Sequence, residues 1–143
     1  MIDQALVEAI SRGQALEIRS DRAGARAVYE GMWIEATRAG DLYQACAAAH
    51  FLAHTYAEPE AQLEWHLRAL HAGEVAGDER VQAFYPSLHA NLAEVYLRLN
   101  DRVRAREHLD QAHAAEYILQ DDGYGRMLRG LIARLTQDLE SGS

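Results

Sequence analysis

The clearest pattern of apolar and polar positions lies between Ser87 and Ala112. Apolar side chains recur there at steps of three and four residues, which is the spacing of one face of an α-helix. They are Leu88, Leu92, Val95, Tyr96 and Leu99, and the pattern starts again at Ala105, Leu109 and Ala112. Between the two runs stands Asn100-Asp101, and aspartate commonly caps the free N–H groups at a helix start. The segment therefore predicts two antiparallel helices joined by a tight turn.

This stretch resembles a tetratricopeptide repeat (TPR). In that family, large, small and aromatic residues follow a fixed order along a helical hairpin. The order is met here by Leu92, Ala93, Tyr96, Ala105, Leu109 and Ala112. Two positions differ: His89 stands where the family usually has tryptophan or another large residue, and Tyr117 stands where it usually has proline. The resemblance implies a right-handed α-solenoid in which the first helix of each pair lines a concave groove that commonly binds peptides.

Small residues recur every forty positions, at Gly13, Ala53, Ala93 and Ala133. Such a spacing predicts four equivalent helices, which is the mark of a repeat protein. Only two prolines and long alanine-rich stretches favour an all-helical chain. We therefore expect an all-α fold, a right-handed TPR-like α-solenoid of three helical hairpins plus a C-terminal capping helix, with about seven helices in all.

Turn and capping residues mark the ends of the predicted helices. The predicted helices cover residues 2–19, 22–38, 41–57, 59–75, 79–99, 102–118 and 123–139. Pro86 falls inside the fifth range, so we expect either a kink there or a helix that begins at Ser87. From Tyr56 to Ala61 the chain is four residues shorter than at the equivalent places in the other hairpins. Residues 1–139 form one predicted domain, and 140–143 a flexible tail.

Composition narrows the function. The 143-residue chain is 49% hydrophobic and carries a formal charge of -8. Net negative charge argues against binding to nucleic acid, because phosphate contacts need clustered cations. No apolar run approaches the roughly 18 residues of a membrane span, and the N-terminus lacks the features of a signal peptide. The single cysteine, Cys46, is flanked by alanines and is interpreted as a small buried residue, and the reducing cytoplasm is the expected location.

The groove implied by the TPR resemblance gives rows of equivalent positions, forty residues apart. One row holds His54, Glu94 and Arg134, an imidazole, a carboxylate and a guanidinium that would attract one another on neighbouring helices. The residues predicted to contact a peptide or partner helix are His50, His54, Asn91, Glu94, Arg98 and Arg134. The same row could instead be a set of salt bridges that only fixes the stacking. The predicted function is non-catalytic binding of a protein or peptide partner.

The pair His50 and His54 raises a metal hypothesis. The two residues are four apart, which suits two ligands on one helix face, with His89 or Glu94 as a third. No zinc-enzyme motif accompanies them. We predict no metal and no cofactor.

Two further hypotheses concern binding of other kinds. One is a sensor-type pocket for a small molecule or signal peptide. The other is a structural homodimer built through Leu128, Leu131 and Leu135. Ser87 has no base-and-acid arrangement specified by the sequence, so no catalytic residues are predicted and the protein is expected not to be an enzyme.

Overall fold

A computed structural model describes residues 4–141 of the chain. Within them the fold is all-α, with eight α-helices, one short 3₁₀ segment and no strand. The helices are α1 (Gln4–Ile18), α2 (Arg22–Ala39), α3 (Leu42–Ala53), α4 (Pro59–Ala76), α5 (Glu79–Gln82), α6 (Tyr85–Arg98), α7 (Arg102–Ala114) and α8 (Gly123–Ser141), with η1 at Glu116–Ile118. The chain forms two compact units: unit 1 extends to Gly77 and unit 2 begins at Asp78. Each is described by itself.

Three connections within the units share one turn. A residue in the left-handed backbone conformation is followed by an aspartate that caps the next helix, at Ser20-Asp21, Gly40-Asp41 and Asn100-Asp101. The aspartate N–H donates to a carbonyl of the preceding helix, as Asp21 does to Leu16 (2.8 Å). Its carboxylate accepts a backbone N–H three residues on, which satisfies a group the helix start leaves open. The caps predicted at Asp21 and Asp101 are confirmed.

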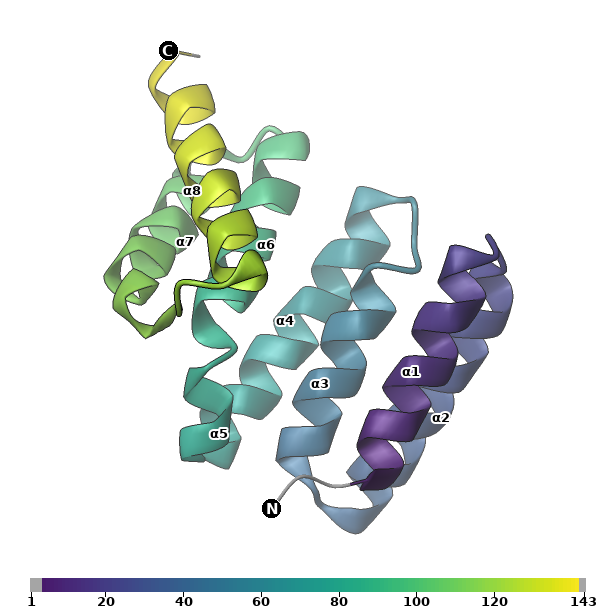
Figure 1. Ribbon diagram of the computed structural model, residues 1–143. Helices are drawn as coiled ribbons and strands as arrows, with labels where there is room; N and C mark the ends of the chain where they lie inside the picture. Colours follow the sequence, from purple (N-terminus) through teal and green to yellow (C-terminus); the bar gives the residue numbers. More distant parts are fainter. Residues whose placement is uncertain (1–3, 142–143) are drawn as a thin grey trace. The chain divides into compact units, whose positions relative to one another are not determined.

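Unit 1 consists of the hairpins α1–α2 and α3–α4, and α2 also packs against α3 (Figure 1). Its core is built around Tyr29 and Leu52, both fully buried. Gly13 leaves space for the Tyr29 ring, because a Cβ at Gly13 would lie only 2.3 Å from that ring. The side chain of Trp33 meets Trp65 edge to face, with ring centroids 5.3 Å apart. Aromatic side chains from α2, α3 and α4 therefore fill the space between the two hairpins.

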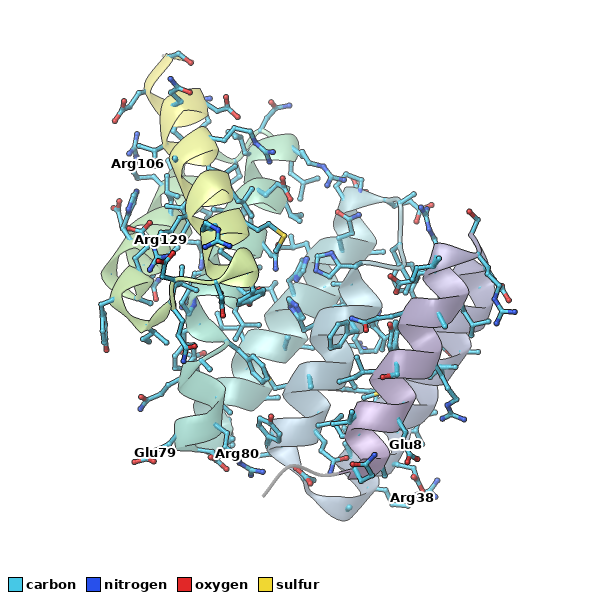
Figure 2. The ribbon with its side chains drawn as sticks, in the orientation of Figure 1. Glu8, Arg38, Glu79, Arg80, Arg106 and Arg129 are labelled. Carbon is cyan, nitrogen blue, oxygen red and sulfur yellow. The ribbon has the colours of Figure 1, made fainter. Side chains whose placement is uncertain are left out.

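Unit 2 pairs α6 with α7, and α8 packs against both (Figure 1). Its buried apolar residues come from all three helices: Leu88, Leu92, Leu109, Ile132 and Leu135. Two arginine side chains form hydrogen bonds to backbone carbonyls at the two ends of α8. Arg129 (Figure 2) donates to the carbonyl of Leu119 (2.8 Å) in the loop before α8. Arg102 on α7 donates to the carbonyl of Leu139 (2.6 Å). These contacts fix α8 at both ends.

The structure corrects several predicted bounds. The single helix expected at 79–99 is two, because the chain leaves helical geometry after Gln82 and α6 begins at Tyr85. Pro86 then lies in the first turn, where its missing N–H removes no helical hydrogen bond. The helix expected at 41–57 ends at Ala53, and that expected at 102–118 ends at Ala114.

At the C-terminal end of the described residues, α8 continues through residues 140 and 141, beyond the helix bound predicted at 139. Residues 142 and 143, and the expected helix start at residue 2, lie outside the described residues.

The forty-residue spacing holds for three helices and changes at the fourth. Gly13, Ala53 and Ala93 are buried, whereas Ala133 is exposed and its neighbour Ile132 is buried. In the described residues no further helix follows α8 to cover this position. Leu128 and Leu135, proposed for a dimer face, are both buried within α8's own unit. They are not available to a second copy in this conformation.

No helix within residues 4–141 combines the length and the apolar character needed to cross a bilayer.

Candidate functional site

Three histidines meet in the hairpin α3–α4 of unit 1. The rings of His50 and His54 are 5.1 Å apart between centroids and nearly perpendicular. His66 from α4 completes the group, with its centroid 5.3 Å from His54 and 6.3 Å from His50. The sequence analysis paired His50 with His54 and missed His66. Because His50 and His66 lie eight residues on either side of Glu58, the pairing of antiparallel helices about their turn would have pointed to it.

His50 is the inner member of this cluster. Its Nδ1 is buried and has no hydrogen-bond partner among the described residues. Burial, and to a lesser degree the neighbouring His54, lowers the pKa of His50 to about 3. His50 is therefore neutral at physiological pH. Among residues 4–141, no group of three or more histidine, cysteine, aspartate or glutamate side chains is arranged to hold a metal ion.

His54 is the outer member of the cluster and is exposed at the end of α3. It lines a hollow of about 400 Å³ together with Glu17, Ser20 and Arg22, which come from the end of α1 and the turn into α2. The hollow brings together an imidazole, a carboxylate, a hydroxyl and a guanidinium. Such a set can accept hydrogen bonds from a peptide N–H and donate them to a carbonyl or carboxylate. This is a polar binding surface contained within unit 1.

Glu94 and Arg134 form an ion pair in unit 2. Arg134 Nη2 on α8 donates to Glu94 Oε2 on α6 at 2.6 Å, and the side chains are 59% and 32% exposed. The two residues stand forty positions apart in the sequence, and their contact joins α6 to α8. A pair this exposed contributes about 0–1 kcal/mol to stability. Its charged groups remain accessible to a ligand.

The two other predicted residues of unit 2 have different surroundings. Asn91 is buried, and its amide donates to Ser87 Oγ (3.2 Å) one turn earlier on α6. Arg98 is exposed at the end of α6. His50 and His54 belong to unit 1, whereas Asn91, Glu94, Arg98 and Arg134 belong to unit 2. The six predicted residues thus divide between the units, and each unit carries its own polar surface.

A second histidine contact, absent from the sequence analysis, lies in unit 2. His89 Nδ1 on α6 and His108 Nδ1 on α7 are 3.0 Å apart, so one ring donates and the other accepts. The Tyr96 ring stacks on His108, at 5.5 Å between centroids. Burial, followed by the nearby His108, lowers the pKa of His89 to about 4. His89 lies eleven residues before Asn100 and His108 lies eight residues after it, on the two helices that the turn joins.

The structure confirms the interpretation of Cys46 as a small buried residue. It has no exposed surface, and burial raises the pKa of its thiol to about 12. The reactive thiolate is therefore scarce at neutral pH.

Comparison of the chain with protein-family models, curated proteins and solved structures gives no match.

Proposed function

We propose that the protein is a non-catalytic interaction module made of TPR-like helical hairpins, and that it binds a peptide segment or partner helix. The observation that carries this proposal is the polar hollow at the end of α3. There His54, Glu17 and Arg22 face one accessible space of about 400 Å³. Groups of both charges around an imidazole suit the dipolar backbone and charged side chains of a peptide.

Two further observations support the repeat part of the proposal. The same turn closes the hairpins α1–α2 and α6–α7, at positions exactly two forty-residue spacings apart. The ion pair Glu94–Arg134 joins positions one spacing apart on α6 and α8. Both are expected of TPR-like units, in which equivalent first helices lie next to each other.

The test is capture of a partner by the immobilised protein, followed by mass spectrometry. The comparison is between wild type, His54→Ala/Arg22→Ala, Glu94→Ala and the control Arg106→Ala. Arg106 is exposed on α7 and lines neither polar surface (Figure 2). We expect a partner enriched by wild type and by the control, and at least severalfold weaker recovery with the His54→Ala/Arg22→Ala variant.

Two outcomes would overturn the proposal. One is that no protein is enriched over an unrelated helical protein of similar charge. The other is equal recovery by all four variants, since the polar surfaces would then contribute nothing. A loss with Glu94→Ala alone would place the contact in unit 2 instead of at the hollow.

A further inference from the structure

A second hollow in unit 1 has a different character. It lies between α2 and α4 with α3 as its floor, and its volume is about 410 Å³. It is lined by Trp33, Thr37, Leu42, Ala45, Leu67, Arg68, His71, Ala72 and Val75. Pockets for small molecules in proteins have volumes of about 300–1,000 Å³ and a mainly apolar lining with a few polar groups. This hollow fits that description in size and in chemistry.

The apolar walls stay accessible to solvent. Leu67 is 39% exposed and Val75 is 59% exposed, although both are large apolar side chains. They are eight residues apart on α4, which corresponds to about 12 Å along a helix. The ring of Trp33 faces them from α2. An apolar ligand about 12 Å long would remove these surfaces from water, with a gain of roughly 25 cal/mol for each Å² covered.

The polar groups of the lining are basic or neutral. Arg68 and His71 lie one turn apart on α4, and Thr37 lies opposite on α2. Within residues 4–141, no acidic side chain lines the hollow. The Arg68 guanidinium lies 4.4 Å from the centroid of the Trp65 ring and is ion-paired with Glu64 through one N–H (2.6 Å), and both side chains of this pair are exposed. A guanidinium has five N–H donors, and a carboxylate is the group whose geometry it matches best.

The geometry points to a binding site for a small amphipathic carboxylate, with its apolar body along Leu67 and Val75 and its carboxylate at Arg68. Charge complementarity decides the head group, because Arg68 brings a guanidinium to the lining and, among the described residues, no carboxylate lines the hollow. Size decides the class of ligand. A stable protein partner buries about 800 Å² on each side, whereas this hollow extends over two turns of one helix. The site is separate from the polar hollow at His54, so the inference does not depend on the proposed function.

Tryptophan fluorescence gives a direct test. The chain has two tryptophans, Trp33 in the wall of the hollow and Trp65 under Arg68. The purified protein is titrated with decanoate, 1-decanol and decylamine, all below their aggregation concentrations. We expect a saturable change with decanoate, an affinity about tenfold higher than for decanol, and the weakest binding for decylamine. Decanoate should also raise the melting temperature, and above its dissociation constant the increase should follow the logarithm of its concentration.

Three variants locate the site. Arg68→Gln should retain binding but reduce the preference for decanoate over decanol from about tenfold to less than about twofold. Val75→Glu places a charge in the apolar wall and should abolish decanoate binding. The matched control is Val103→Glu on α7, where the valine is 71% exposed and lines no part of the hollow. Because Val75 and Val103 are both surface residues, circular dichroism should show both variants folded.

The inference is overturned if decanoate gives no saturable signal. Equal affinities for decanoate, decanol and decylamine would overturn the assignment of the carboxylate. Decanoate binding by Val75→Glu equal to that by Val103→Glu would show that the ligand binds elsewhere. None of these results bears on partner capture through His54, so the two proposals fail separately.

Discussion

The hairpin α1–α2 in unit 1 and the hairpin α6–α7 in unit 2 have the same turn and different cores. Ser20 and Asn100 both have φ of 62°, and the aspartate after each donates to an equivalent carbonyl at 2.8 and 2.9 Å. Yet α1–α2 combines Gly13 with Tyr29, whereas the residues eighty positions on are Ala93 and Leu109. All the large members of these pairs are fully buried. The hairpin with the smaller residue on its first helix, Gly13, therefore has the larger residue on its second helix, Tyr29.

The hairpin α3–α4 shows what happens when the turn itself is lost. Its shortened loop has no left-handed residue followed by aspartate, and an arginine from a third helix holds it instead. The Arg26 guanidinium on α2 donates to Thr55 Oγ1 and to the Thr55 carbonyl, and lies 3.9 Å from the centroid of the Tyr56 ring. The comparison separates a turn that its own residues close from a loop that depends on tertiary contacts.

The largest predicted effect is at Arg26. Arg26→Met removes two hydrogen bonds and a cation–π contact, and leaves the buried Thr55 without its donor, so we expect unit 1 to lose about 3 kcal/mol. The matched control is Arg106→Met, eighty positions on in α6–α7, where the arginine is exposed and should contribute less than about 0.5 kcal/mol. Urea unfolding followed by circular dichroism measures both. Equal losses would show that the α3–α4 loop does not depend on Arg26.

Next comes the pair that fills α1–α2. Gly13→Ala drives a methyl group into the Tyr29 ring and should cost about 2 kcal/mol. Gly31→Ala on α2, where no atom lies within 4 Å, should instead stabilise by up to about 1 kcal/mol through helix propensity. Combining Gly13→Ala with Tyr29→Leu reproduces the pair found in α6–α7. The double variant should lose less stability than the sum of the single ones, and strict additivity would refute the size compensation.

Acid should weaken both histidine-bearing hairpins. His50 and His89 have folded-state pKa values of about 3 and about 4, below the ordinary 6.5. The unfolded chain therefore binds more protons as the pH falls below about 6.5, so stability is fully present above that pH and decreases below it. Each histidine should contribute a slope of about 1 kcal/mol per pH unit between about pH 6 and its folded-state pKa. The free energies of unfolding of His50→Gln and His89→Gln should each depend less steeply on pH than that of wild type. Slopes equal to the wild-type slope would contradict this prediction.

The smallest predicted effects test the shared turn. Asp21→Ala and Asp101→Ala each remove one helix cap and should cost about 1 kcal/mol. The two losses should agree within about 0.5 kcal/mol, because the turn and the cap hydrogen bond are the same in both hairpins and the additional ion pair of Asp101 with Arg104 is on the surface. Differential scanning calorimetry at neutral pH provides the comparison. A much larger loss at one site would mean that its aspartate has a role beyond the cap.

Sequence reasoning succeeds where the signal is local. The helical spacing at Leu88 to Leu99, the caps at Asp21 and Asp101 and the helix start at Pro59 all depend on residues a few positions apart, and the structure has each of them. It fails where a residue distant in the sequence determines where a helix ends. The end of α3 at Ala53 depends on a loop that Arg26 holds, and nothing near residue 53 encodes that contact.

The candidate site follows the same rule. The forty-residue separation and the opposite charges of Glu94 and Arg134 suggest a contact between them, and the structure has this ion pair. The contact of the His66 ring with the rings of His50 and His54 depends on how α4 packs against α3. The apolar hollow could not be predicted either, since its lining comes from three helices and no motif links Trp33, Leu42 and Val75.

The dependence of the α3–α4 loop on Arg26 has a consequence for the order of folding. A turn that is capped by its own aspartate forms through contacts between residues close in the sequence. Such contacts form early and fast during folding. The α3–α4 loop has local contacts of Thr55 with Leu52 and of Gln62 with Tyr56, but it gains the Arg26 contact, across twenty-nine residues, only when α2 is docked. We therefore expect α1–α2 to become structured before α3–α4 within unit 1, with the second hairpin completed on the template of the first.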